Sequence, residues 1–208
     1  MRYIQKKREP AALTNYRSSP GAKYDGDNGF PVVKEAIRQA LVAEQRGLCG
    51  FCEMRVQASA SRMRIAHRTP QSVDPSQDLN WRNLLAACLG NEGNTPTHCD
   101  VAQHNTPLQL DPTQAQHCAT LRFERARLVS SNPVFAHEID SVLQLNSKLL
   151  CDRREEALDK YISAWFAGRS SVPRTVLERM KAALDTPGEL PAYVSYLQSW
   201  LNRHIRAR

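Results

Sequence analysis

Apolar residues recur every three or four positions in a segment near the start of the chain. The repeating face runs from Val33 to Leu41, and Pro31 stands where the first turn of a helix tolerates proline. Gly47 ends the pattern, as glycine often does just past the end of a helix. This spacing predicts an amphipathic helix that is followed at once by the sequence Cys-Gly-Phe-Cys at residues 49–52.

The same helical spacing returns in the last third of the chain, from about residue 132. We expect four amphipathic helices there, with Asp152 as the N-cap and Gly168 as the C-cap of the second. The four segments are residues 132–150, 152–168, 171–184 and 190–207. Their apolar faces predict a C-terminal helical bundle that packs against the region before it.

Between residues 53 and 113 the pattern of apolar positions is irregular. Residues 53–57 and 62–68 resemble short strands, whereas residues 80–89 predict a short helix. Such a segment holds too little continuous apolar sequence to form a large core, so it needs an additional source of stability. A bound zinc ion would supply that stability.

The first 30 residues are basic and then rich in Pro, Gly, Ser and Asp, which predicts an extended N-terminal arm. The chain as a whole is therefore expected to be an α+β protein that is predominantly helical. Its expected parts are the arm at residues 1–30, a metal-stabilised domain at residues 31–113, and a helical region at residues 114–208.

Composition narrows the class of protein. No apolar run approaches the roughly 18 residues of a membrane span, and no hydrophobic stretch follows the charged N-terminal residues, so we expect a cytoplasmic protein. The formal net charge of +7 fits a polyanionic partner. In a reducing compartment the six cysteines are expected to be metal ligands or buried thiols, with Cys118 and Cys151 as packed thiols.

The other four cysteines fall into two pairs that together can close one zinc site. Cys49 and Cys52 are two residues apart, which lets both sulfurs of a tight turn face one ion. Ten residues separate Cys88 from Cys99, and the Gly and Pro content of that loop allows the chain to return. Two alternatives stay open, a buried thiol at Cys88 and His98 as ligand in place of Cys99. A redox pair would need a thioredoxin-like strand and helix, which the sequence does not show.

Three polar residues are interleaved with these cysteines. His67 leaves a predicted strand, Asn83 stands near a predicted helix entry, and Asp100 follows the last cysteine. Taken singly, each suits an ordinary role as a packed imidazole, a cap or a turn residue. Taken together, they offer a base near neutral pH and oxygen ligands for a hard divalent cation. Their joint order favours a centre that hydrolyses phosphodiester bonds.

The blocks CGFCE, AHRTPQS, WRNLLAAC and HCDVAQHNTPL resemble the successive blocks of a Cys-x2-Cys HNH nuclease domain. This resemblance implies a zinc-stabilised ββα-metal (HNH) core with flanking helices. With MRYIQKKREP, CATLRFER, SSNP and LQLN included, the sequence resembles the HNH component of Septu-type antiphage systems, the PtuB family, including versions encoded beside retrons. The resemblance covers most of the chain up to about residue 150.

The resemblance also implies roles for individual residues. His67 corresponds to the catalytic base, Asn83 to the residue that orients it or assists the metal site, and Asp100 to a ligand of a catalytic Mg²⁺ or Mn²⁺. One departure is that Ala66 stands where the family often has an acidic metal ligand. His104 is available as a replacement ligand.

The implied function is a metal-dependent HNH endonuclease that acts as the effector subunit of a bacterial antiphage complex. The implied partners are a PtuA-type ATPase and, in some systems, a retron reverse transcriptase with its RNA–DNA product. The substrate would be DNA or RNA, including transfer RNA. The alternative is a non-catalytic, zinc-stabilised adaptor in the same kind of assembly, which Ala66 keeps open.

Overall fold

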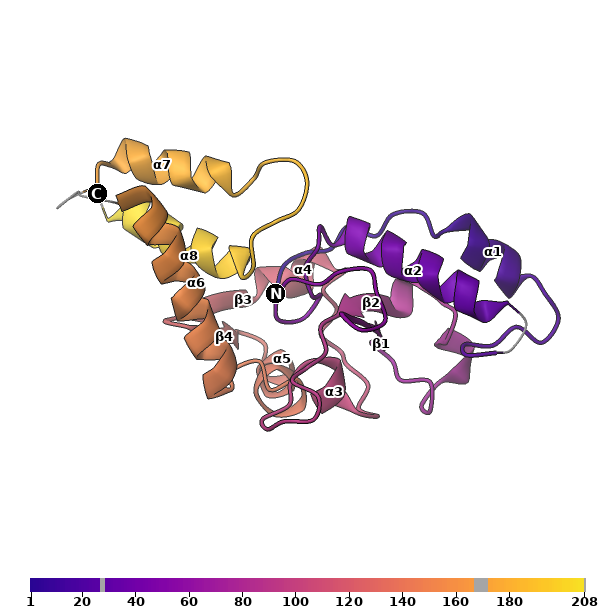
Figure 1. Cartoon of the computed structure of the whole chain (residues 1–208). Helices are drawn as coiled ribbons and strands as arrows, with labels where there is room; N and C mark the ends of the chain where they lie inside the picture. Colours follow the sequence, from indigo (N-terminus) through magenta and orange to yellow (C-terminus); the bar gives the residue numbers. More distant parts are fainter. Residues whose placement is uncertain (27–28, 167–171, 208) are drawn as a thin grey trace.

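Two short β-hairpins lie between helices at the two ends of the molecule (Figure 1). The computed structural model describes residues 1–26, 29–166 and 172–207. The expected α+β class is confirmed, and the buried apolar residues form one continuous cluster that joins both ends. None of the described helices combines the length and the apolarity that crossing a bilayer requires.

Two helices, α1 (Ala11–Arg17) and α2 (Phe30–Glu44), form one end of the molecule, on the right in Figure 1. Helix α2 confirms the predicted amphipathic helix, because Val33, Ile37 and Leu41 are all buried. Helix α1 lies within the segment that was expected to be an extended arm. Helix α1 has only seven residues, too few for an apolar repeat to stand out in the sequence. Tertiary packing stabilises it, since the ring centroid of Tyr16 lies 5.2 Å from that of Phe30 in a tilted arrangement.

The middle of the chain forms the first hairpin, in which β1 (Arg64–His67) pairs antiparallel with β2 (Leu84–Ala87). The prediction of a helix over residues 80–89 was wrong, since one 3₁₀ turn at Trp81–Asn83 leads directly into β2. All four residues of β2 are buried, and a short run of apolar residues does not distinguish a buried strand from a buried helix. The predicted strand at residues 53–57 is reduced to one bridge, between Leu48 and Arg55.

Short elements connect this hairpin to the rest of the chain. A second 3₁₀ turn, Pro75–Gln77, lies in the loop between β1 and β2, and helix α3 (Asp100–Gln103) follows the loop after β2. Helix α4 (Ala115–Ala119) then leads to the second hairpin, β3 (Leu121–Glu124) with β4 (Arg127–Ser130).

The C-terminal region is less uniformly helical than its sequence predicts. Residues 132–150 do not form one helix but divide into α5 (Pro133–His137), a π-helical turn (Glu138–Val142) and the start of α6 (Lys148–Phe166). Helix α6 begins before the expected N-cap Asp152, and the expected C-cap Gly168 lies outside the described residues.

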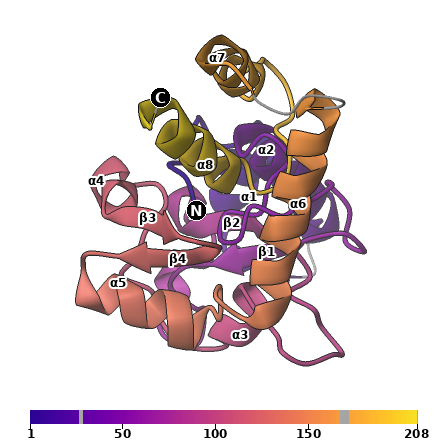
Figure 2. The same cartoon turned by 90° about the vertical axis from the view of Figure 1, so that its left-hand side faces the viewer.

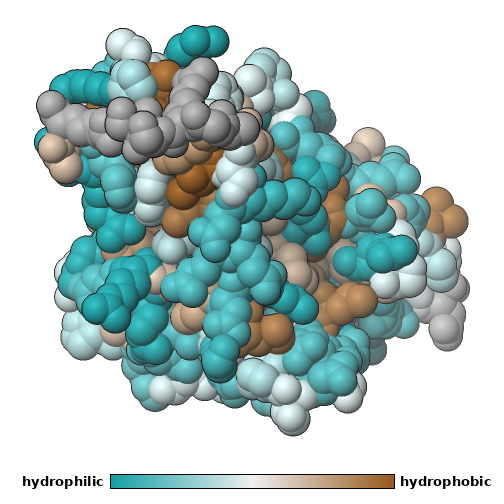
Figure 3. Space-filling model, turned by 60° about the vertical axis from the view of Figure 1, so that its left-hand side comes forward, coloured by the Kyte–Doolittle hydropathy of each residue, from teal (hydrophilic) through white to brown (hydrophobic). Residues whose placement is uncertain are grey.

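Helices α7 (Arg174–Ala183) and α8 (Val194–Arg206) complete the chain, as predicted. Helix α8 lies between α7 and the β3–β4 hairpin, and α6 runs along their side (Figure 2). On the face of the molecule seen in Figure 3, the described residues are mostly hydrophilic, with smaller apolar areas between the polar side chains.

Two buried charged side chains connect the C-terminal elements to the rest. Arg154 on α6 donates hydrogen bonds to the carbonyl oxygens of Ala126 (2.9 Å) and Leu145 (2.8 Å). Glu53, immediately after the second cysteine, accepts hydrogen bonds from the backbone N–H of Ser195 (2.9 Å) and from its hydroxyl (2.6 Å). The cysteine-containing turn is therefore attached to the first turn of α8.

We predict that Glu53→Ala lowers the free energy of unfolding by about 3–5 kcal/mol, because it leaves buried hydrogen-bond donors without their acceptor. Urea denaturation followed by circular dichroism would measure the loss. Glu189→Ala is the matched control, since the ion pair of Glu189 with Arg55 is exposed and should contribute at most about 1 kcal/mol. Equal losses in the two variants would contradict the prediction.

Candidate metal centre and adjoining cavity

Four cysteines meet in the interior where three segments of the chain come together. Cys49 and Cys52 lie in the turn after α2, Cys88 follows β2, and Cys99 precedes α3. All four are buried, and their sulfur atoms lie within 4.8 Å of one another. Two of the Sγ–Sγ distances are 3.8 Å (Cys49 to Cys99) and 3.7 Å (Cys52 to Cys88).

These distances fit a tetrahedral zinc ion. With zinc–sulfur bonds of about 2.3 Å, the edges of a regular tetrahedron are about 3.8 Å long. Burial raises the pKa of the Cys99 thiol well above its ordinary value, so four neighbouring thiolates would need a cation among them. The four cysteines are thus placed to hold a structural zinc ion.

The backbone around the first pair forms a tight turn. The N–H of Cys49 donates to the carbonyl of Met54 (2.8 Å), and the N–H of Glu53 donates to the carbonyl of Cys49 (3.1 Å). The N–H of Met54 also points at the sulfur of Cys52, at 3.4 Å. The N–H of Gly50 donates to the carbonyl of Ala86 (2.8 Å), which holds this turn against β2.

The wide spacing of the second pair is explained by a close contact at the base of its loop. The N–H of His98 donates a hydrogen bond to the carbonyl of Gly90 at 2.9 Å. The two ends of the loop between Cys88 and Cys99 therefore lie next to each other. A Cβ atom at position 90 would lie 2.4 Å from the carbonyl oxygen of His98, and Gly90 also has a φ of +61°. Only glycine suits this position.

The structure places the Cys99 sulfur, and not the His98 ring, in the four-sulfur cluster. His98 is fully buried beside it, with Nδ1 3.2 Å from the sulfur of Cys99. Its ring therefore lies where it can donate a hydrogen bond to a thiolate ligand. Cys118 and Cys151 do not belong to the cluster, and each is half-buried.

A cavity of about 700 Å³ opens on one face of the β1–β2 hairpin. Three of the residues singled out in the sequence line it, namely His67, Asp100 and His104. The same cavity is lined by three basic side chains, Lys34 and Arg38 of α2 and Arg64 of β1, and by the carboxylate of Asp25, which pairs with Lys34. Imidazole, carboxylate and cationic groups are therefore brought to one place by α2, β1 and the α3 segment.

His67 is the last residue of β1, and one of its two ring nitrogens is hydrogen-bonded. Its Nε2 lies 3.0 Å from the backbone carbonyl of Asp78, and the terminal amide of Gln71 lies 3.2 Å from the same nitrogen. A carbonyl oxygen can only accept, so the shorter contact, with Asp78, requires the proton on Nε2 and leaves the lone pair on Nδ1. The amide nitrogen of Gln71 can only donate, so this tautomer requires the Gln71 amide to turn its oxygen toward the ring. Within the described residues, Nδ1 has no hydrogen-bond partner in the protein.

The electrostatic surroundings keep the ring of His67 neutral. Burial lowers its pKa below the ordinary value of 6.5, although the carbonyl of Asp78 and the carboxylate of Asp100 act in the opposite direction. A neutral imidazole with a free lone pair is the form that accepts a proton.

Asn83 does not line the cavity but organises the loop beside it. The side chain is buried, its oxygen accepts from the N–H of Thr69 (2.8 Å), and its nitrogen donates to the carbonyls of Thr69 (2.9 Å) and Gln77 (3.1 Å). Asn83 therefore fixes the chain just after His67.

The carboxylate of Asp100 is already engaged by a neighbouring cation. Its Oδ2 accepts a hydrogen bond from Nε of Arg64 at 2.7 Å, and Arg64 also pairs with Glu92 at 3.2 Å. Burial raises the pKa of the Asp100 carboxyl, and Arg64 opposes that shift. Ala66, by contrast, is fully buried and adds no side-chain ligand to the cavity.

Several contributors to this site were missed in the sequence. Gln103 donates to the carbonyls of His67 (3.1 Å), Arg68 (3.0 Å) and Thr106 (3.0 Å), which attaches α3 to the end of β1. Arg64 and Asp78 contribute through the contacts just described. Their polar residue types carried no distinctive spacing, so only the folded chain reveals them.

The fold and the site define an α+β protein with a buried four-cysteine centre next to a basic cavity. No protein-family model matches the chain. The Septu protein PtuB of Bacillus thuringiensis is 26% identical to it over 98 residues. The matched segment covers 47% of this chain and 38% of that protein, so the chain spans well under half the length of the relative it matches. This similarity supports a relationship to Septu proteins.

We predict that the purified chain holds about one zinc ion and that Cys52→Ser loses both the metal and the folded state, because structural zinc contributes directly to folding free energy. Elemental analysis and circular dichroism would measure the two effects. Cys118→Ser is the control, since Cys118 lies outside the cluster. Full zinc content in Cys52→Ser would refute the assignment.

Proposed function

We propose that this protein is a metal-dependent HNH endonuclease that hydrolyses phosphodiester bonds of DNA or RNA. The observation that carries the proposal is that His67, Asp100 and His104 line one basic cavity. The order of elements also fits a ββα-metal core, since the antiparallel β1–β2 hairpin is followed by α3 and joined to it through the four cysteines.

The chain's own residues supply the protein part of the chemistry. Nδ1 of His67 is the group that would take the proton from an attacking water. Lys34 and Arg38 of α2 line the same cavity and would contact phosphates of the substrate. Asn83 keeps the loop after His67 in place.

Asp100 and His104 are the residues that would hold a catalytic Mg²⁺ or Mn²⁺. Carboxylate oxygens suit both ions, and Oδ1 of Asp100 is not used by Arg64. When bound, such an ion stabilises the charge that develops on the phosphoryl group and on the leaving oxygen.

The similarity to a Septu protein supports a role in antiphage defence. In that role the chain would be the cutting subunit of a complex with a PtuA-type ATPase and, where a retron is present, with its reverse transcriptase and RNA–DNA product. Free nuclease activity would harm the host, so the partner is expected to control access to the cavity.

A second candidate function is a non-catalytic adaptor in the same assembly. Two observations favour it: the acidic ligand that often precedes the histidine is replaced by the buried Ala66, and Arg64 occupies one oxygen of Asp100. In an adaptor, the cysteine centre would serve only to support the fold.

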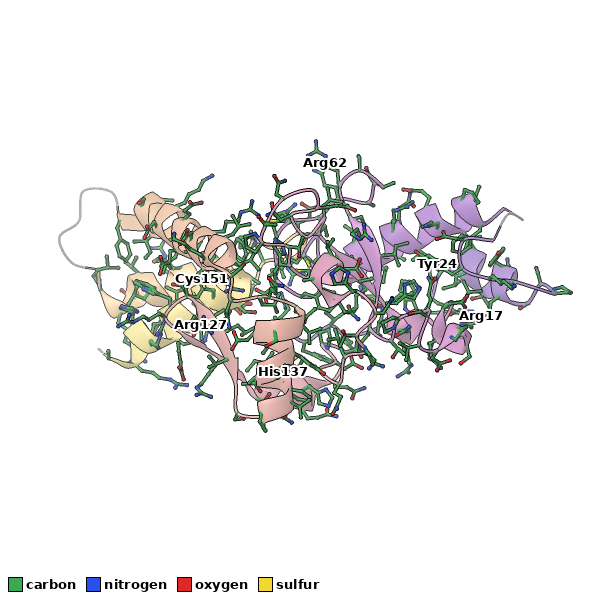
Figure 4. The ribbon with its side chains drawn as sticks, turned by 90° about the horizontal axis from the view of Figure 1, so that it is seen from below. Arg17, Tyr24, Arg62, Arg127, His137 and Cys151 are labelled. Carbon is green, nitrogen blue, oxygen red and sulfur yellow. The ribbon has the colours of Figure 1, made fainter. Side chains whose placement is uncertain are left out.

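The two functions are separated by His67→Ala. We expect it to leave zinc content and folding intact but to reduce cleavage by about 10²- to 10⁴-fold, because the general base is lost. Cleavage by the purified complex and phage protection in cells would be measured together. His137→Ala is the matched control, since His137 lies on α5 and does not line the cavity (Figure 4). Unchanged protection by His67→Ala would favour the adaptor.

The pH dependence of cleavage provides an independent test. Because burial lowers the pKa of His67, its ring stays neutral to a lower pH than a free histidine does. Single-turnover cleavage should therefore reach half of its maximum at a pH below 6.5 on the acid side of the profile. A midpoint above 6.5 would argue against His67 as the base.

A further inference from the structure

Tyr24, from the segment between α1 and α2, packs against the ring of His67. The two ring centroids are 4.6 Å apart and the ring planes meet at 84°, which is a T-shaped contact. Tyr24 lies beside α2 and lines the same cavity as His67 (Figure 4). T-shaped contacts are favourable for aromatic rings and restrict their rotation.

A second link joins Tyr24 to the same histidine through Asp78. The backbone N–H of Tyr24 donates to Oδ2 of Asp78 at 3.0 Å, and the backbone carbonyl of Asp78 lies 3.0 Å from Nε2 of His67. Each of the three residues, Tyr24, Asp78 and His67, therefore contacts the other two, and we call this set of contacts the circuit. The ring contact fixes the plane of the imidazole, and the carbonyl fixes which nitrogen carries the proton.

Helix α2 holds Tyr24 in position from its other side. The ring of Phe30 makes a T-shaped contact with Tyr24 at 4.9 Å, and the ammonium group of Lys34 lies 4.9 Å from the centroid of the Tyr24 ring. Lys34 also pairs with Asp25, the residue after Tyr24. Contacts with α2 therefore hold the Tyr24 ring in place, and the Tyr24 ring in turn restricts the imidazole of His67.

We propose that Tyr24, assisted by Asp78, is a positioning residue that holds His67 with Nε2 protonated and Nδ1 free in the cavity. This proposal rests on the proposed nuclease function, in which Nδ1 accepts the proton. It makes the segment between α1 and α2 part of the catalytic site. Tyr24 acts through His67, so its removal should lower kcat and leave KM nearly unchanged.

The test uses the full-length, zinc-loaded chain with ¹⁵N-labelled histidine. Without nucleic acid or magnesium, the ring nitrogens of His67 should show Nε2–H as the single neutral tautomer. In Tyr24→Leu the imidazole is no longer held in the plane that aims Nε2 at the Asp78 carbonyl, so we expect a mixture of tautomers, seen as convergence of the two nitrogen shifts. For cleavage by the purified complex with magnesium, we expect a fall in kcat of roughly tenfold with KM within about twofold. Tyr24→Phe, which keeps the ring, should restore the tautomer and most of kcat.

Tyr3→Leu is the matched control, because Tyr3 is an exposed tyrosine outside the cavity, and it should change neither measurement. If Tyr24→Leu fails to fold, Asp78→Ala removes the other side-chain contact of the circuit and should shift the tautomer in the same direction. An unchanged tautomer in the folded variant overturns the proposal. A changed tautomer, together with no cleavage by the purified complex in the presence of magnesium, supports the positioning contact and refutes the nuclease function.

Discussion

The four-sulfur cluster is the constraint on which the rest of the structure depends. It joins the turn after α2, the end of β2 and the start of α3, and within the described part of the chain no long apolar strand or helix connects these three segments. Because Cys88 and Cys99 fix both ends of the loop between β2 and α3, the cluster also determines where Asp100 meets β1. Glu53, next to Cys52, connects the cluster to α8 by accepting two hydrogen bonds from Ser195.

The cavity next to the cluster is assembled mainly by side chains that bond to the backbone. Asn83 holds the loop after His67, and Gln103 holds α3 against the end of β1. Such contacts fix atoms more narrowly than apolar packing does, since each requires a donor and an acceptor at a set distance. The chain on both sides of the His67 imidazole is thereby kept in one arrangement beside the cavity.

Sequence patterns predicted the elements that have a long or distinctive signal. Helix α2 followed from its apolar face, and the cysteines followed from their spacing, which the cluster supports. The pattern failed where local sequence is ambiguous. Residues 84–87 are apolar enough for either a helix or a buried strand, and the break near Gln144, which has a φ of +49°, interrupts an otherwise helical repeat. Tyr24 was missed because only the fold brings it to His67.

The contact between Gly90 and His98 has a consequence for how related sequences are recognised. This hydrogen bond closes the base of the loop between Cys88 and Cys99. Residues 92–96 form the exposed tip of that loop, which we call the excursion. Additions or deletions in that excursion would leave the positions of Cys88 and Cys99 unchanged. The number of residues between these two cysteines can therefore change without moving their sulfur atoms. A search pattern that requires a fixed interval would overlook proteins with the same centre, whereas one that requires a glycine two residues after the third cysteine would retain them.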